Sequence, residues 1–368
     1  MAVFPLKLVF CTFRMLCVLA TNLYSIPAYL IWMFMLWPIR FVFPKVYWKL
    51  EALLFKGLLA IIVTWLYTAG YQVYESGDDI SSLYKESCLV ICNHQSTADI
   101  LVLMTALQGK GLVGGHVMWI MDSIFKFTHF GAVSLVREDF FIHQGKEGRI
   151  KEIQRLGAHL KNSFFLYFKK WLVLFPEGGF LRKRRDASIR YAEEHDLPIL
   201  HHVTLPRTGA MNAIIEAIAG QRQIADSRID KEIAEVSSNA QLEWVIDMTI
   251  AYPQGRPLDL QGVIFGYWPP CQVVVHYKAY PFVDIPSDLE SLTKWLYDRY
   301  EEKENMLDHY YQLNRVPSSE FPRRCLPLRT DGLMQVDILH ISLYHLFFIV
   351  STYLHILYIY GPLLSLLF

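Results

Sequence analysis

The carboxyl-terminal segment, residues 338–368, limits the possible folds of this chain more than any other feature. It contains no Asp, Glu, Lys or Arg, and aromatic residues are dense in it. A stretch of this length can satisfy its backbone polar groups in lipid only as a helix, so we expect a transmembrane helix over residues 338–361. Basic residues precede the segment and none follow it. The positive-inside bias therefore predicts that the preceding residues face the cytosol.

Two further apolar stretches lie near the amino terminus. Residues 8–38 are almost continuously apolar and contain Pro27, and residues 52–68 form a shorter stretch with one lysine. The first is longer than the apolar core of a signal peptide, and no small-residue cleavage pattern follows it. We interpret it as an uncleaved membrane anchor that either spans the bilayer or turns back at Pro27. The second is either another membrane helix or an interfacial helix that lies against the following domain.

The chain between these apolar ends, residues 70–330, predicts a mixed α/β domain. Only 19% of all residues are charged, which fits a membrane protein, and the zero net charge argues against broad electrostatic binding to nucleic acid. Helical patterns cover residues 99–108 and 148–168, and residues 221–240 are polar enough for a surface excursion. Short apolar runs typical of buried strands alternate with these patterns, at residues 88–92, 132–136, 171–175, 199–204, 244–251 and 272–277.

The most informative motif, NHQSTAD at residues 93–99, directly follows the predicted strand at residues 88–92. In open α/β sheets, functional sites form at the carboxyl ends of strands. A helix that begins within the motif lets Asp99 in its first turn reach back to His94. Because a carboxylate fixes the tautomer of a histidine and stabilises the imidazolium, this pattern indicates that His94 is a general base oriented by Asp99. A pair with this spacing alone also occurs in purely structural roles.

Three more loops follow predicted strands. Residues 176–179, PEGG, contain glycines that let the backbone approach a ligand, and the basic run at residues 182–185 follows them. This run is either a solvated or juxtamembrane surface or a patch that binds phosphate. The segment GAVSLVR ends on Arg137, and the segment LPRTG contains Arg207. Each arginine taken alone is more often an ordinary surface residue, but the four loops together suggest one site.

The four loops resemble the motifs of the glycerolipid acyltransferases, the PlsC-type superfamily. NHQSTAD is similar to the first motif NHxxxxD, GAVSLVR to the second motif GxxFxxR, VLFPEGG to the third motif FPEGTR, and LPRTG to the proline loop of the fourth motif. Residues 290–315 resemble the WLxxRFxEK segment in the extension of eukaryotic members. The chain most closely resembles the lysophosphatidylglycerol acyltransferase subfamily, and the resemblance covers nearly all of residues 20–330.

This resemblance implies an α/β fold in which helices flank a mixed sheet, with membrane helices at the amino terminus and a transmembrane helix at the carboxyl terminus. It also implies four regions along the chain. These are membrane anchor segments at residues 1–69, a catalytic domain at 70–285, a carboxyl-terminal extension at 286–330 and the transmembrane helix at 338–361.

The activity implied by the resemblance is acyl transfer from acyl-coenzyme A to a lysophospholipid in phospholipid remodelling. His94 would remove the hydroxyl proton and Asp99 would orient His94, while backbone N–H groups near Gly178 would stabilise the oxyanion. We expect direct transfer, because the chain has no GxSxG elbow and no cysteine within a motif. The motifs assign acceptor binding, including the lipid phosphate, to Arg137, Glu177, Gly178, Arg182 and Arg207.

The sequence departs from the superfamily pattern in two motifs. Ser134 stands where the second motif usually has Phe, and Gly179-Phe180 stands where the third has Thr-Arg. The missing arginine removes one phosphate contact, for which Arg182 is a candidate substitute. We therefore expect an acceptor with a headgroup beyond bare phosphate, such as lysophosphatidylglycerol or lysophosphatidylethanolamine, because a phosphodiester needs fewer cations than a phosphomonoester.

Two alternatives remain at this point: an acyltransferase that acts on a neutral acceptor such as monoacylglycerol, and a catalytically inactive lipid-binding relative. Acyl-coenzyme A is expected as co-substrate, without a cofactor, and the histidines lack the paired spacing of a metal site. The six cysteines form no CxxC pair, which fits reduced thiols. We expect the endoplasmic reticulum membrane, with the catalytic domain facing the cytosol, membrane lipids as partners and no nucleic acid. The sequence does not indicate an oligomeric state.

Overall fold

A computed structural model describes residues 3–143, 145, 148–164, 167–227, 242–313, 332–362 and 365. Within these residues, one sheet contains eight strands in the order β4-β3-β5-β2-β6-β7-β1-β8. The strands from β4 to β6 in this order are parallel, β7 is antiparallel to β6 and parallel to β1, and β8 is antiparallel to β1. The strand bounds are β1 Gln72–Gly77, β2 Cys88–Cys92, β3 Val117–Asp122, β4 Phe140–Ile142, β5 Trp171–Leu174, β6 Trp244–Ala251, β7 Gln272–Pro281 and β8 Gly332–Leu333.

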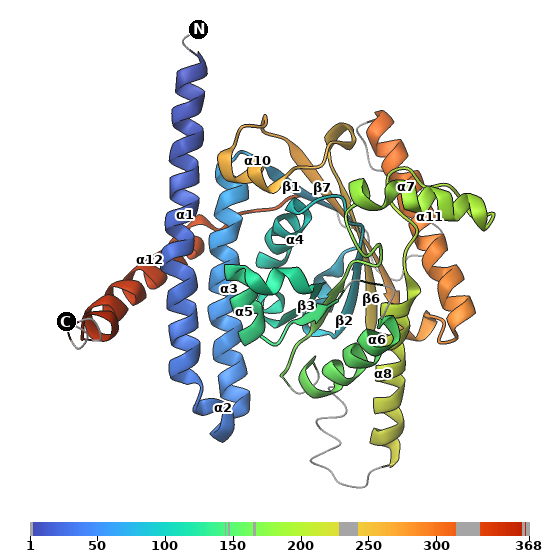
Figure 1. Cartoon of the computed structure of the whole chain (residues 1–368), viewed down its shortest axis with the longest axis horizontal. Coiled ribbons are helices and arrows are strands. Elements are labelled where there is room, and N and C mark those ends of the chain that lie inside the picture. The colour runs from blue at the N-terminus through green and yellow to red at the C-terminus, as the bar shows by residue number, and fades with distance from the viewer. Residues whose placement is uncertain are drawn as a thin grey trace.

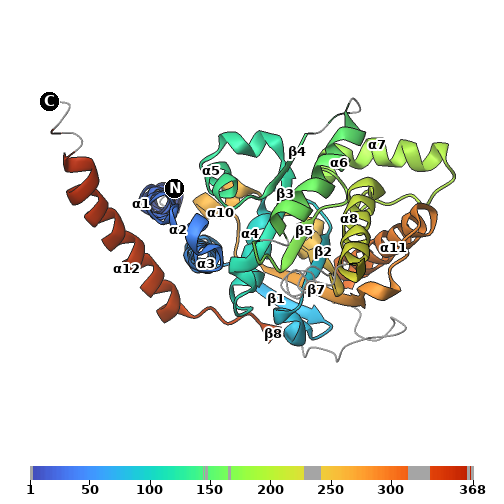
Figure 2. The same ribbon diagram turned by 90° about the horizontal axis from the view of Figure 1, so that it is seen from below.

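Helices cover both faces of this sheet (Figure 2). The α-helices α3, α4, α5 and α10 lie on one side, and α6, α8 and α11 lie on the other. This arrangement confirms the predicted fold class.

The α-helix bounds are α1 Val3–Leu36, α2 Ile39–Val42, α3 Pro44–Thr68, α4 Ala98–Gln108, α5 His129–Val136, α6 Arg149–His159, α7 Leu181–Glu194, α8 Thr208–Ser227, α10 Leu260–Phe265, α11 Leu289–Leu313 and α12 Ile338–His355. Shorter helical turns are η1 Ile80–Lys85, η2 Val113–His116, η3 Ser123–Phe127, η4 Leu160–Phe164, η5 Pro253–Gly255, η6 Phe282–Asp284 and η7 Ile356–Tyr360.

Strand β2 lies at the centre of the parallel part of the sheet. Cys88 of β2 is in register with Trp171 of β5 on one side and with Trp244 of β6 on the other. Every residue of β2 and β5 is buried, as expected for parallel strands that are covered on both faces. Because β2 and β5 are adjacent and parallel, the loops that leave their carboxyl ends emerge side by side.

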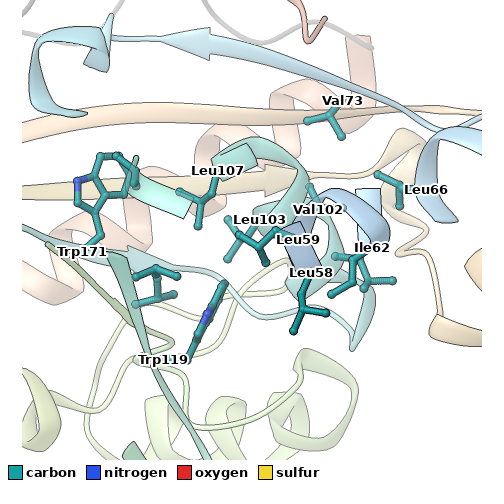
Figure 3. Close-up of a cluster of buried hydrophobic side chains, with 14 of the residues drawn as sticks. Leu58, Leu59, Ile62, Leu66, Val73, Val102, Leu103, Leu107, Trp119 and Trp171 are labelled. Carbon is teal, nitrogen blue, oxygen red and sulfur yellow. The ribbon is translucent and has the colours of Figure 1, made fainter. Parts of the chain in front are cut away.

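The hydrophobic core between α3, α4 and the sheet holds the amino-terminal helices against the domain (Figure 3). Burying one leucine side chain stabilises a fold by about 1.5–3 kcal/mol, so this packing contributes strongly to stability. Helix α3 starts with Pro44 at its first position and ends before Gly70, which has a φ of 84° and closes the helix. The labelled core residues are Leu58, Leu59, Ile62 and Leu66 of α3, Val102, Leu103 and Leu107 of α4, Val73, Trp119 and Trp171.

Three of the described helices are long and apolar enough to cross a membrane: α1, α3 and the carboxyl-terminal helix Ile338–Tyr360. They differ in burial, because 67% of the most apolar part of α3 is buried, against 22% in each of the other two. Helices α1 and α3 run side by side, joined through α2, and α12 crosses α1 obliquely on the side away from the domain (Figures 1 and 2). The chain is thus associated with a membrane through apolar helices, of which α3 is the most deeply buried against the domain.

Two predicted strands are wrong. Residues 132–136 belong to helix α5, which begins where the side chain of Thr128 accepts a hydrogen bond from Gly131 N. A short apolar run does not distinguish a strand from a buried helix, and the capping threonine lies outside the run. Residues 199–204 form an irregular loop whose backbone N–H groups donate to side chains instead of to a neighbouring strand.

The other predicted elements agree more closely with the structure. The runs at residues 88–92 and 244–251 are β2 and β6, and those at 171–175 and 272–277 correspond to β5 and β7. The helical pattern at 99–108 is α4, and that at 148–168 contains α6 followed by the π turn η4. Of the polar segment at residues 221–240, the part to Ser227 continues α8 and the remainder lies outside the described residues.

A buried ion-pair cluster joins the amino-terminal helices to the domain. Glu51 of α3 pairs with Arg137 at the end of α5, and its other oxygen lies 3.0 Å from the Lys169 ammonium. Tyr29 of α1 donates a hydrogen bond of 3.1 Å to the same carboxylate. The side chains of Glu51, Arg137 and Lys169 are at most 1% exposed, so each charge depends on the others for compensation.

We expect Glu51→Gln to destabilise the protein by about 3–5 kcal/mol, because it leaves two buried cations with one carboxylate fewer. The melting temperature of purified protein in detergent measures this effect. Glu194→Gln serves as the control, since Glu194 is an exposed glutamate on α7. If Glu51→Gln had the same melting temperature as Glu194→Gln and the wild type, the ion-pair cluster would not be needed to hold the helices to the domain.

Candidate active site

The side chains of His94 and Asp99 are in direct contact at the carboxyl end of β2. His94 Nδ1 lies 2.9 Å from Asp99 Oδ2, and the Asp99 side chain is fully buried. The backbone N–H groups of Gln95 and Ser96 donate to the same oxygen at 2.6 and 2.9 Å, and Tyr252 OH donates to Oδ1 at 2.6 Å. Asp99 is the acceptor in each of these contacts, so the nitrogen of His94 that faces it is a donor. His94 Nδ1 therefore carries the proton, and Nε2 keeps a free electron pair.

The turn that carries His94 is fastened to the neighbouring strand β6. Asn93 donates from its amide to Ile250 O at 3.0 Å and accepts from Ile250 N at 2.8 Å. Helix α4 begins at Ala98, whose N–H donates to Ser96 Oγ, so Asp99 lies in the first helical turn. The predicted contact between the two motif residues is thus possible because the helix starts between them.

Two aromatic rings enclose the imidazole of His94. The ring of Phe175 stacks on it with centroids 4.1 Å apart, and the ring of Phe180 lies at 4.4 Å. The His94 side chain is 13% exposed, so it remains accessible on one side. Phe180 occupies the motif position where the superfamily usually has arginine. From the sequence, this departure is only a lost cation. The contact of Phe180 with His94 is visible only in the structure.

Glu177 lies inside the domain, between the loop after β2 and the loop before α8. Its carboxylate is buried and accepts from His94 N at 2.7 Å, from Thr204 N at 3.0 Å and from Thr204 Oγ at 2.8 Å. Burial raises the pKa of Glu177 to about 8, although these hydrogen bonds favour its charged form. The residue expected to bind acceptor therefore holds two loops together, the one after β2 and the one before α8.

The side chains of two arginines contact Gly178. It has a φ of 68°, and a Cβ at this position would lie 3.2 Å from Arg207 Cδ, so the Arg207 side chain packs directly on the glycine. Arg184 donates from Nη2 to Gly178 O at 2.8 Å. The N–H of Gly178 donates to Phe175 O at 3.1 Å, so it already has a partner and differs from the expected oxyanion donor.

The other two predicted arginines lie in different surroundings. Arg182 is exposed on the first turn of α7, whereas Arg184, which the sequence analysis did not single out, contacts the glycine loop. Arg137 is completely buried, with Glu51 and Asp139 as ionic neighbours and with Nη2 2.5 Å from Val117 O. Arg137 thus points inward from the end of α5 and is paired within the protein, and its expected role in holding a lipid phosphate stays a prediction.

Within the described residues, no group of three or more His, Cys, Asp or Glu side chains is placed to hold a metal ion. The geometry instead brings together His94, Asp99, Glu177, Gly178 and Arg207 from three segments of the chain: the turn after β2, the loop after β5 and the loop before α8. Tyr252 and Thr204, which complete the hydrogen bonds of the two buried carboxylates, were not found from the sequence, because their partners are distant along the chain. Burial and contact with Asp99 raise the pKa of Tyr252 well above its usual value, so it remains a donor.

Comparison with known proteins identifies the family. A family model described as Acyltransferase matches residues 73–227, and one described as Acyltransferase C-terminus matches residues 264–330. The chain is similar to the acyl-CoA:lysophosphatidylglycerol acyltransferase 1 of Homo sapiens, with 44% identity over 300 residues and 81% of each chain covered. The protein of the same name from Mus musculus is 44% identical over 299 residues, which cover 81% of this chain and 80% of that one.

More distant relatives include the 1-acyl-sn-glycerol-3-phosphate acyltransferase 2 of Arabidopsis thaliana, 24% identical over 306 residues, which cover 82% of this chain and 71% of that one. A solved structure, the 1-acyl-sn-glycerophosphate acyltransferase PlsC of Thermotoga maritima, aligns with a TM-score of 0.36 and 14% identity over 80% of this chain and 98% of that one, a similarity too weak for comparing details. The 44% identity over 81% of both chains shows that this protein belongs to the glycerolipid acyltransferase family.

Proposed function

We propose that this protein transfers an acyl group from acyl-coenzyme A to the free hydroxyl of a lysophospholipid, with His94 as the general base. The observation that carries the proposal is the pairing of His94 Nδ1 with the buried Asp99 carboxylate at 2.9 Å. This pairing leaves Nε2 as the proton acceptor of a side chain that is 13% exposed. The alternative of a catalytically inactive relative is less well supported, because an inactive protein would not need this arrangement.

The proposed reaction is a direct transfer. The acceptor hydroxyl gives its proton to His94 Nε2 while its oxygen attacks the thioester carbonyl carbon. The new C–O bond forms, the C–S bond breaks, and coenzyme A leaves as a thiolate that takes the proton back from His94. A thiol has a pKa near ~8.5, so this leaving group needs no strong acid. Asp99 stabilises the imidazolium that exists between the two proton transfers.

We infer that the lipid phosphate binds beside the glycine loop. Arg207 is exposed there and packs on Gly178, and Arg184 donates to the carbonyl of the same residue. Arg182, two residues before Arg184 and exposed on the first turn of α7, adds positive charge nearby. Guanidinium groups suit this role because they bind phosphate oxygens in a bidentate geometry.

The acceptor class is proposed from two considerations. The mammalian relatives at 44% identity are named as acyltransferases of lysophosphatidylglycerol. In this chain Phe180 replaces the usual arginine of the third motif and lies against His94, which removes one cation from the acceptor side of the site. A phosphodiester such as lysophosphatidylglycerol or lysophosphatidylethanolamine carries one charge, so it loses less from this change than the dianionic lysophosphatidic acid.

The proposed location is the endoplasmic reticulum membrane, with residues 70–330 on the cytosolic side, where acyl-coenzyme A is available. The apolar helices support membrane association, and the basic residues that precede α12 support this orientation. We propose that the lysophospholipid reaches the site directly from the membrane, since such acceptors reside there.

We expect His94→Ala to lower the rate of acyl transfer by about 10²-fold or more, since a general base typically contributes 10²–10⁴-fold. The rate is measured as coenzyme A thiol released by purified enzyme with a lysophospholipid acceptor. His143→Ala is the matched control, because the His143 side chain is 58% exposed. A His94→Ala variant that kept more than half of the wild-type rate would exclude the proposed mechanism.

The headgroup proposal predicts that lysophosphatidylglycerol or lysophosphatidylethanolamine is a better acceptor than lysophosphatidic acid by kcat/KM. Phe180→Arg restores the arginine of the third motif, so it should raise the ratio of kcat/KM for lysophosphatidic acid to that for lysophosphatidylglycerol. Phe180→Leu removes the aromatic ring without adding charge and is the control. All acceptors, including monoacylglycerol, are compared at matched micellar concentration. If lysophosphatidic acid or monoacylglycerol were the best acceptor of the wild type, the headgroup proposal would be wrong.

For the topology, we expect protease added to sealed microsomes to digest the catalytic domain, because the positive-inside bias puts it on the outer, cytosolic face. An epitope after the last residue should be protected until detergent opens the vesicles. A lumenal endoplasmic reticulum protein serves as the control for vesicle integrity. Protection of the catalytic domain in intact vesicles would refute the orientation.

A further inference from the structure

The loop at residues 199–204 is held by two carboxylates, Glu304 of helix α11 and Glu177 of the loop after β5. His201 N donates to one oxygen of Glu304 at 2.7 Å, and His202 N and Val203 N donate to the other oxygen at 2.7 and 3.1 Å. The next N–H, that of Thr204, donates to Glu177 at 3.0 Å. Four consecutive backbone donors thus find their partners on two side chains.

This arrangement explains why an apolar run that suits a strand stays irregular. A buried or half-buried backbone N–H needs a partner, and a carboxylate is a stronger acceptor than a neutral carbonyl. Glu304 binds three successive N–H groups, those of residues 201–203, so it fixes both the position and the direction of the backbone there. Glu304 therefore fixes the start of the segment that leads to Arg207, while Glu177 and Ser188 hold Thr204 and Leu205 in its middle.

Arg207 lies three residues beyond the end of this loop. Its backbone N–H donates to Pro176 O at 2.8 Å, and its side chain packs on Gly178 in the loop after β5. Glu304 holds one end of the segment from His201 to Arg207, and the loop after β5 holds the other. A shift at the first end would move the guanidinium of Arg207 relative to His94.

Helix α11, which carries Glu304, also contacts the loop after β2. Tyr300 OH donates to Cys92 O at 3.1 Å, and Tyr311 OH accepts from Gln95 Nε2 at 3.0 Å. Lys303 anchors the helix to β6, because it pairs with Asp247 and donates to Met248 O. The helix packs on the sheet face opposite α3 and α4 (Figure 2). The same rigid element therefore contacts both loops that the proposed reaction requires.

We propose that Glu304 is a positioning residue for acceptor binding, which acts by placing Arg207 against the phosphate of the acceptor. Its removal changes the affinity for the acceptor and leaves the affinity for acyl-coenzyme A and the chemistry at His94 nearly unchanged. This proposal rests on the proposed function, since it assumes a phosphate-bearing acceptor near Arg207.

The test compares Glu304→Gln with Glu301→Gln, which changes an exposed glutamate of the same helix. We expect Glu304→Gln to raise the acceptor KM by about tenfold, the size of change that follows from weakening hydrogen bonds to a charged group. The KM for acyl-coenzyme A should change less than twofold. Hydrogen–deuterium exchange of a peptide that covers residues 199–207 should become faster in Glu304→Gln only.

A double-mutant cycle with Arg207→Ala separates positioning from general stability. If Glu304 acts through Arg207, Glu304→Gln should have little further effect on acceptor KM in the Arg207→Ala background. Additive effects of the two changes would overturn the proposal, as would a lower melting temperature of Glu304→Gln with an unchanged acceptor KM. Wild-type enzyme that releases no thiol with any lysophospholipid would instead overturn the proposed function, and this inference with it.

Discussion

The buried carboxylate of Glu177 is the interaction on which the site depends. It accepts the backbone N–H of His94 from the loop after β2 and both donors of Thr204 from the loop before α8. Because β2 and β5 are adjacent and parallel, Glu177 leaves the sheet directly beside the turn that carries His94. A single side chain thereby sets the distance between the proposed base and the segment that leads to Arg207. Its burial gives these hydrogen bonds their strength, since no water competes for the carboxylate.

Buried carboxylates also connect the outer parts of the molecule to the sheet. Glu51 attaches the amino-terminal helices through Arg137, and Asp247 attaches the carboxyl-terminal extension through Lys303. Uncompensated buried charges are costly, so each of these groups is matched by a partner of opposite sign. The membrane-facing parts of α1 and α12 are apolar instead. Only 19% of the residues are charged, and several of these charges are buried. There they fix the positions of the amino-terminal helices and the carboxyl-terminal extension relative to the sheet.

Elements whose structure depends on neighbouring residues could be predicted from the sequence. The strands β2 and β6 and the helix α4 are confirmed, because continuous apolar runs and the start of a helix depend on neighbouring residues. Residues 132–136 and 199–204 were wrongly predicted as strands for two different reasons. The first run is capped by Thr128, which lies outside it. The second is held by Glu304, which lies about a hundred residues further along the chain.

The sequence by itself determined the mixed α/β class, the apolar terminal helices and the pairing of His94 with Asp99. These features follow from hydrophobic periodicity and from motif spacing over a few residues. Tertiary structure alone decided that Arg137 is buried against Glu51, that Glu177 is buried and holds two loops, and that Phe180 lies against His94. The reason is physical: whether a polar side chain faces solvent or a buried partner depends on elements that are distant in sequence, and a local pattern contains no information about them.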